Sequence, residues 1–106
     1  MLQQARVLAP DFHEYLVAKK KVSKNTLWAY ERDVEAFQKY LKDCGLTEVS
    51  ANSQTISDFK CHLQSTGFSN SSVCRVMSSL RTYYKFLMEN GFVSSNPARS
   101  VKNEKI

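Results

Sequence analysis

Two short polar stretches carry the residues best suited to bind a charged ligand. Each stretch lies where a helix is predicted to begin, and the free backbone N–H groups of a helix start attract anions. Hydroxyl, amide and cationic side chains in such a place are groups that contact nucleic-acid phosphates. The residues are Lys20, Lys21, Ser23, Lys24, Asn25 and Thr26 in the first stretch, and Ser69, Asn70, Ser71, Ser72 and Arg75 in the second.

Helix capping is an alternative explanation for each stretch taken alone, because Ser and Thr are preferred immediately before a helix. An ordinary serine-rich surface is a second alternative for the later stretch. The occurrence of two basic helix starts in one basic chain favours DNA binding over both. Arg75 is also long enough to reach a base edge or a neighbouring phosphate.

The charge of the chain is distributed unevenly. The net charge is +5 over 106 residues, with sums of +3 for residues 1–26, −2 for residues 27–68 and +4 for residues 69–106. Positive ends around a mildly acidic middle indicate a one-sided electropositive surface, as nucleic-acid binders have. Simple solubility is the plainer explanation of the same numbers.

Neither a metal site nor an enzyme is indicated. The three cysteines, Cys44, Cys61 and Cys74, are widely spaced, and the sequence has no CxxC or HxxxH pair. There is no glycine-rich phosphate loop and no recognisable pair of catalytic carboxylates, and most of the five tyrosines fall on apolar helix faces. We therefore expect no metal, no cofactor and no catalytic residue, and we expect reduced thiols in a cytoplasmic protein. We also expect no membrane partner, because no apolar run is long enough to span a bilayer.

The apolar periodicity predicts an all-α fold, a compact bundle of four to five helices. The predicted helices cover residues 10–20, 24–44, about 53–65 and 69–90, with Pro10 at the first position of the first helix and Gly45 and Gly91 as stops. Ser23 is the expected cap of the second helix, and Ser53 or Thr55 that of the third, where Thr55 and Asp58 resemble a capping box. In the second helix the apolar stripe includes Leu27, Tyr30, Val34, Phe37, Leu41 and Cys44, widened by Trp28 and Tyr40. In the last helix the core-facing side includes Val73, Met77, Leu80, Tyr84 and Leu87.

Five motifs, in order along residues 10–100, make the chain resemble a known family. They are Phe12-x-x-Tyr15-Leu16; Ser23-x-Asn25-Thr26-Leu27-x-x-Tyr30-x-x-Asp33-Val34-x-x-Phe37-x-x-Tyr40-Leu41; Ile56-x-x-Phe59-x-x-x-Leu63; Ser69-x-x-Ser72-Val73-x-x-x-x-Ser78-x-Leu80-Arg81-x-x-Tyr84-x-Phe86-Leu87; and Gly91-Phe92-x-x-x-Asn96-Pro97-Ala98. Together they resemble the core-binding domain of tyrosine site-specific recombinases, which include phage integrases and Xer-type enzymes.

The resemblance implies a SAM-like helical bundle that clamps one side of a recombination-site duplex. It places the DNA-facing surface on the second and fourth helices, which adds Ser79 to the residues chosen above. Because Ser71 and Ser79 are short, backbone contact is expected there, and base readout is not. The partner implied is double-stranded DNA, with the isolated domain a monomer and the full-length protein oligomeric on DNA.

The same resemblance sets the expected domain organisation. Residues 1–9 form a leader, residues 10–94 the helical domain, and residues 95–106 the start of an interdomain linker. The catalytic arginine, lysine, His-x-x-Arg and tyrosine of the family belong to a following domain, so this chain is expected to be an inert fragment by itself. A helical protein-interaction domain, anchored through Trp28 or Phe92, is the alternative from another functional class.

Overall fold

The computed structural model describes residues 12–100 of the chain. Within that range the order of elements is a first helix over residues 12–20, α2 (Lys24–Asp43), α3 (Ser53–Ser65), α4 (Asn70–Glu89) and the short 3-10 helix η2 (Pro97–Ser100), without a strand. The second part of the first helix is the π-helical segment η1 (Leu16–Lys20). The predicted leader, Pro10 and residues 101–106 lie outside the described residues. No helix in the described range is long and apolar enough to cross a membrane.

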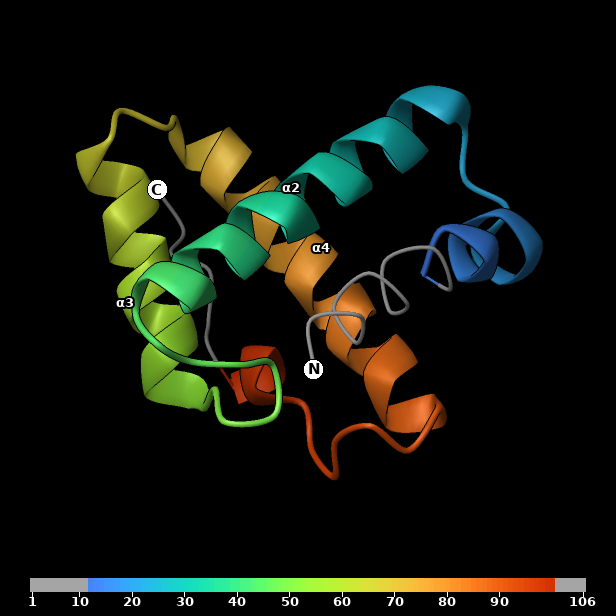
Figure 1. The fold of residues 1–106 in the computed structure, drawn as a ribbon. Helices are drawn as coiled ribbons and strands as arrows, with labels where there is room; N and C mark the ends of the chain where they lie inside the picture. The colour runs from blue at the N-terminus through green and yellow to red at the C-terminus, as the bar shows by residue number, and fades with distance from the viewer. Residues whose placement is uncertain (1–11, 101–106) are drawn as a thin grey trace.

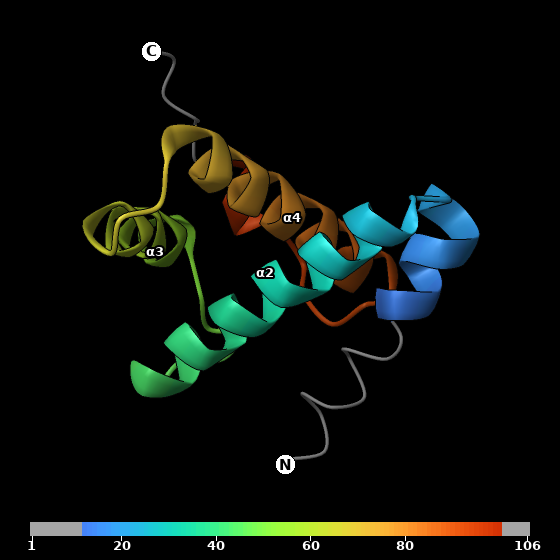
Figure 2. The same ribbon diagram turned by 90° about the horizontal axis from the view of Figure 1, so that it is seen from above.

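The helix α4 lies at the centre of the fold. The helix α2 crosses it, α3 packs beside its N-terminal half, and η2 contacts both α3 and α4 (Figure 1). The first helix covers the C-terminal half of α4 through Phe12, whose ring lies 5.0 Å from that of Tyr83 and 5.5 Å from that of Phe86. The view from above shows α2 and α4 crossing, with α3 on the far side of α4 from the first helix (Figure 2).

The apolar face of α4 forms most of the core. Its buried residues recur at spacings of three and four, which places them on one side of the helix. The predicted core positions Val73, Met77, Leu80, Tyr84 and Leu87 are all buried, with Val76, Tyr83 and Phe86 beside them. Each such large side chain contributes about 1.5–3 kcal/mol on burial, so this one helix face stabilises the packing of every other element.

The ends of α2 and α4 follow the predicted local signals. Ser23 precedes α2, and its Oγ accepts from the N–H of Thr26 at 3.3 Å. At the other end, Gly45 has φ +73 and its N–H donates to Lys42 O, while the N–H of Leu46 donates to Leu41 O. This pair of bonds is a Schellman ending, which needs a left-handed residue and so favours glycine. Gly91 ends α4 in the same way.

The start of α3 differs from the prediction. The capping residue is Asn52, one position before Ser53, and Thr55 is the third residue of the helix. The side chain of Asn52 accepts from the N–H of Thr55 at 3.0 Å, and the Thr55 hydroxyl accepts from the N–H of Asn52 at 3.2 Å. Asn ranks with Ser as a capping residue, and this reciprocal pair replaces the predicted one between Thr55 and Asp58. The predicted buried stripe of Ile56, Phe59 and Leu63 is confirmed.

Asn96 and Ala98, within the stretch predicted as the start of an interdomain linker, contact the helical body. Ala98, in η2, is buried, and Asn96 holds the segment in place by donating from Nδ2 to Arg81 O at 3.1 Å. The N–H of Ala98 donates to Asn96 Oδ1 at 3.1 Å. The segment has too few residues to show a helical period, so the sequence pattern alone did not reveal that it packs.

Candidate nucleic-acid interface

The two polar stretches lie at helix starts on the same side of the molecule. Both α2 and α4 begin at the upper edge in Figure 1 and diverge from their crossing point toward that edge. Lys21, Lys24 and Asn25 are exposed at the start of α2, and Asn70 and Ser71 are exposed at the start of α4. The side chain of Lys20 lies outside what the structure describes. The fold therefore brings the two stretches, 43 or more residues apart in sequence, to one face.

Several of the predicted contact residues also cap their helices. Ser69 Oγ accepts from the N–H of Ser72 at 3.2 Å and lies 3.1 Å from Ser72 Oγ, to which it donates. Ser23 Oγ donates to Thr26 Oγ1 at 3.0 Å in the equivalent place on α2. Helix capping, the alternative explanation given by the sequence, thus accounts for part of each polar stretch. Exposed Lys24, Asn25 and Asn70 do not cap either helix.

Lys21 has an unusual backbone conformation, with φ 51 and ψ 43. This left-handed conformation costs a residue other than glycine or asparagine about 1–2 kcal/mol. Its N–H donates to Leu16 O, which closes the first helix. The turn directs the exposed lysine and the start of α2 toward the same face.

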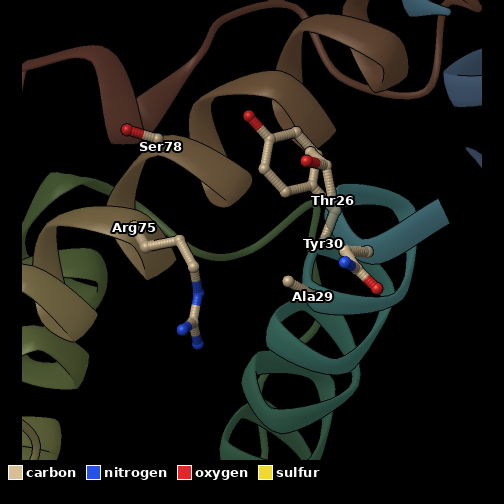
Figure 3. Close-up of a pocket in the computed structure, with 6 residues that line it drawn as sticks. Thr26, Ala29, Tyr30, Arg75 and Ser78 are labelled. Atoms are coloured by element: carbon tan, nitrogen blue, oxygen red, sulfur yellow. The ribbon is translucent and has the colours of Figure 1, made fainter. Parts of the chain in front are cut away.

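An open groove of about 430 Å³ lies between the N-terminal part of α2 and α4. Its lining consists of Asn25, Thr26, Ala29 and Tyr30 from α2 and Arg75 and Ser78 from α4. Figure 3 shows the Arg75 side chain extending from α4 into the space that faces Ala29. The small side chains of Ala29 and Ser78 leave room for a ligand to approach the helix backbones at this point.

Arg75 is held by an acid on the opposite helix. Its Nε donates to Asp33 Oδ2 at 3.1 Å and its Nη2 donates to Asp33 Oδ1 at 2.8 Å, a two-bond pairing of guanidinium and carboxylate. The Asp33 side chain is only 5% exposed, whereas the Arg75 side chain is 46% exposed. The hydrogen bonds to Asp33 raise the pKa of Arg75, against the opposite effect of burial. The arginine is thus a permanent cation fixed in one orientation beside the groove.

Ser79 completes this arrangement, and its predicted role needs correction. Its side chain is fully buried, and its Oγ donates to Asp33 Oδ2 at 2.7 Å. A hydroxyl beneath the surface cannot touch a duplex outside the molecule. Ser79 instead positions Asp33, which in turn positions Arg75.

Asp33 is the residue of this site that the sequence reading missed. The motif that contains Asp33 indicates no contact for its side chain. A signal was present, because Asp33 lies between Tyr30 and the buried Val34 and Phe37, within the apolar stripe of α2. An acid at a core-facing position requires a partner, and only the fold identifies that partner as Arg75.

A second, smaller groove continues from the first. It has a volume of about 210 Å³ and shares Ala29 and Arg75 with its neighbour. Trp28 and Phe68 line it and are 61% and 41% exposed. The prediction that Trp28 widens the buried stripe of α2 is therefore wrong, because the diverging helices leave this sector of α2 uncovered. The guanidinium of Arg32 lies over the Trp28 ring, 4.9 Å from its centroid.

The five tyrosines lie in the hydrophobic core or against it. Tyr15, Tyr83 and Tyr84 are buried, and Tyr30 and Tyr40 pack against the core, as predicted. Burial, followed by the nearby Glu48 carboxylate, raises the pKa of Tyr83 and of Tyr84, which makes both phenols poorer nucleophiles at neutral pH. In the described part of the chain, no group of His, Cys, Asp and Glu side chains is arranged to hold a metal ion.

These features define a small all-helical domain with an open groove between the N-terminal parts of two helices. The chain belongs to the family of phage integrase N-terminal SAM-like domains, which matches residues 10–91. The resemblance read from the five motifs is thereby confirmed.

Curated relatives agree with this assignment. The chain is 35% identical over 86 residues to the tyrosine recombinase XerD of Rhizobium meliloti, a match that covers 81% of the chain and 28% of the relative. It is 33% identical over 90 residues to XerD of Rickettsia conorii, covering 85% of the chain and 29% of the relative. It is 32% identical over 108 residues to the tyrosine recombinase XerC of Listeria monocytogenes, covering 99% of the chain and 35% of the relative. The chain thus spans about a third of the length of these relatives.

Proposed function

We propose that this chain is the core-binding domain with which a tyrosine recombinase clamps one side of its recombination-site duplex during DNA integration or recombination. Strand cleavage belongs to a separate domain of such a recombinase, so the chain by itself is catalytically inert. The partner is double-stranded DNA in the cytoplasm. The isolated domain acts as a monomer, and the full-length protein assembles on DNA.

The observation that carries this proposal is the shared face of the two helix starts. Exposed lysines at the start of α2 and exposed Asn70 and Ser71 at the start of α4 lie on either side of the groove that contains Arg75. Helix starts, hydroxyls and cations are the groups that contact a DNA backbone. Their presence at the starts of two helices, on one face of the molecule, fits a duplex laid across the groove.

Fluorescence anisotropy with a labelled duplex tests the proposal. At low salt we expect weak binding that declines as salt is added, with a slope of log K against log salt of about −3 to −4 for roughly four phosphate contacts. A failure to bind any duplex at low salt would contradict the proposal. Binding that does not change with salt would contradict the assignment of phosphate contacts to this face.

A helical protein-interaction domain remains the second candidate function. The observation in its favour is the exposure of Trp28 and Phe68 along the smaller groove. Trp28 is the single tryptophan of the chain, so its fluorescence reports on this groove alone. Indifference to DNA, together with a blue shift of this emission when a protein partner is added, would favour the second candidate.

A further inference from the structure

Arg75 has a free edge whose geometry is set by Asp33. A guanidinium carries five N–H groups, and the bonds from Nε and Nη2 to Asp33 use two of them along one side of the fork. The opposite side presents one N–H of Nη1 and one of Nη2, which point in parallel. Within residues 12–100, no hydrogen bond occupies that side.

The support beneath Arg75 is rigid. Asp33 is buried, and it receives a third hydrogen bond from Ser79 Oγ at 2.7 Å in addition to the two from Arg75. Its carboxylate is thus held from two points on α4, one turn apart. Arginine side chains otherwise lose much rotational freedom on binding, and here that ordering is already present in the free protein.

The pairing also changes what Arg75 can contribute. The carboxylate of Asp33 cancels most of the positive field of Arg75, so this arginine adds less to general phosphate attraction than unpaired Lys24 does. What Arg75 contributes instead is a pair of N–H donors held in a fixed direction. Two parallel N–H donors match the O6 and N7 acceptors of guanine in the major groove.

We infer that Arg75 reads a guanine in the bound duplex and that Asp33, supported by Ser79, is the positioning residue for this readout. The inference rests on the proposed function. It adds base recognition to a face that was otherwise assigned phosphate contacts. Ala29 and Ser78, which line the groove beside Arg75, are small enough to let a base edge come close.

The test is selection of binding sites from a duplex library of randomised sequence by the full chain. We expect one position to be fixed as guanine. Replacing that guanine by 7-deazaguanine, which lacks the N7 acceptor, should weaken binding about 5- to 150-fold. In Arg75→Lys, which keeps the charge and loses the fork, the same replacement should have almost no effect.

Two further variants complete the design. Arg99→Lys is the same chemical change at an exposed residue of η2, away from the groove, and should keep the guanine preference. Asp33→Asn should lower the preference for guanine while raising affinity for unrelated duplexes, because a negative charge is lost. A merely structural Asp33 would lower both quantities together. Circular dichroism establishes that each variant is folded.

The outcomes separate the two levels of the proposal. Failure of the chain to bind any duplex would overturn the proposed function. Binding without a fixed guanine, or a 7-deazaguanine effect of equal size in Arg75→Lys, would overturn only the readout and would leave Arg75 as a phosphate contact.

Discussion

The hydroxyl of Tyr83 lies 2.8 Å from Oε2 of Glu48, and this bond joins the C-terminal half of α4 to the loop between α2 and α3. Gln38 on α2 donates to both groups at 3.1 Å. The hydroxyl of Tyr84, the next residue, donates to the backbone oxygen of Glu48 at 2.9 Å. Two adjacent buried phenols therefore fix one loop residue through its side chain and its backbone.

This arrangement predicts a loss of stability at alkaline pH. Burial raises the pKa of both phenols above the ordinary value of 10.0, with a further contribution from Glu48. The folded state then keeps protons that the unfolded state releases, so the stabilisation is fully present below about pH 10 and is lost as the pH rises further. We expect the free energy of unfolding to fall by up to about 1.4 kcal/mol per pH unit for each tyrosine above that point.

Urea unfolding of the wild type and of Tyr83→Phe, at neutral pH and at several alkaline values, measures this effect. At neutral pH the variant should lose about 1–3 kcal/mol, because Glu48 and Gln38 each lose their hydrogen bond to the Tyr83 hydroxyl and keep only the bond to each other. Above pH 10 its stability should decline less steeply than that of the wild type. Parallel curves for the two proteins would show that Tyr83 is not responsible.

The two serines at the start of α4 are expected to differ in their effect on stability. Ser69→Ala removes the acceptor for the N–H of Ser72 and should cost about 1 kcal/mol of unfolding free energy. Ser71→Ala, two positions away on an exposed site, should stay within about 0.5 kcal/mol of the wild type. Chemical denaturation of both variants checks the difference. Equal losses would mean that Ser69 does not act as the cap.

The exit segment is expected to add stability to the domain. Asn96→Ala removes the bonds to Arg81 O and to the N–H of Ala98. We expect a loss of about 1–2 kcal/mol, since these bonds help to hold η2 against α4. Thermal unfolding measures it, with Ser95→Ala, at an exposed neighbouring position, as the control. An unchanged transition in Asn96→Ala would place the end of the stable domain before this segment.

The local signals in the sequence sufficed for most of the fold. Apolar spacing and glycine stops identified α2, α3 and α4 to within a residue or two, because helix formation depends on neighbours three and four positions apart. The predicted cap of α3 was wrong by one to three residues, because Asn52, Ser53 and Thr55 are all residue types that cap helices.

The candidate site was less predictable, and the reason is distance along the chain. The Asp33–Arg75 pair is separated by 42 residues and the Asp33–Ser79 pair by 46. No periodic pattern relates such positions, so Arg75 read as a free cation and Ser79 as a surface hydroxyl. The prediction that Trp28 is buried was wrong for a related reason. Its exposure depends on where α2 and α4 diverge, and an apolar stripe does not show this.

Lys24 provides the sharpest test of the phosphate contacts. Lys24→Gln should weaken duplex binding and reduce the magnitude of the salt slope by about 0.9, the value for one lost contact. Lys39→Gln removes the same charge from an exposed position on the same helix, about 22 Å away along its axis. If binding depended on net charge alone, the two variants would behave alike. We expect the Lys39 variant to keep the wild-type slope, as measured by anisotropy titrations over a range of salt concentrations.

Trp28 distinguishes the DNA face from the adjacent apolar groove. The ring is 61% exposed and lies under the Arg32 guanidinium, so Trp28→Ala should cost no more than about 1 kcal/mol of stability, the value of an exposed cation–π contact. If the duplex lies across the first groove alone, the variant should bind DNA within about twofold of the wild type, a difference of about 0.4 kcal/mol. A tenfold loss would instead extend the DNA contact over the second groove and remove the observation that favours a protein partner there. Iodide quenching of Trp28 in the wild type, with and without saturating duplex, gives an independent answer, because a ring outside the contact stays equally accessible in both states.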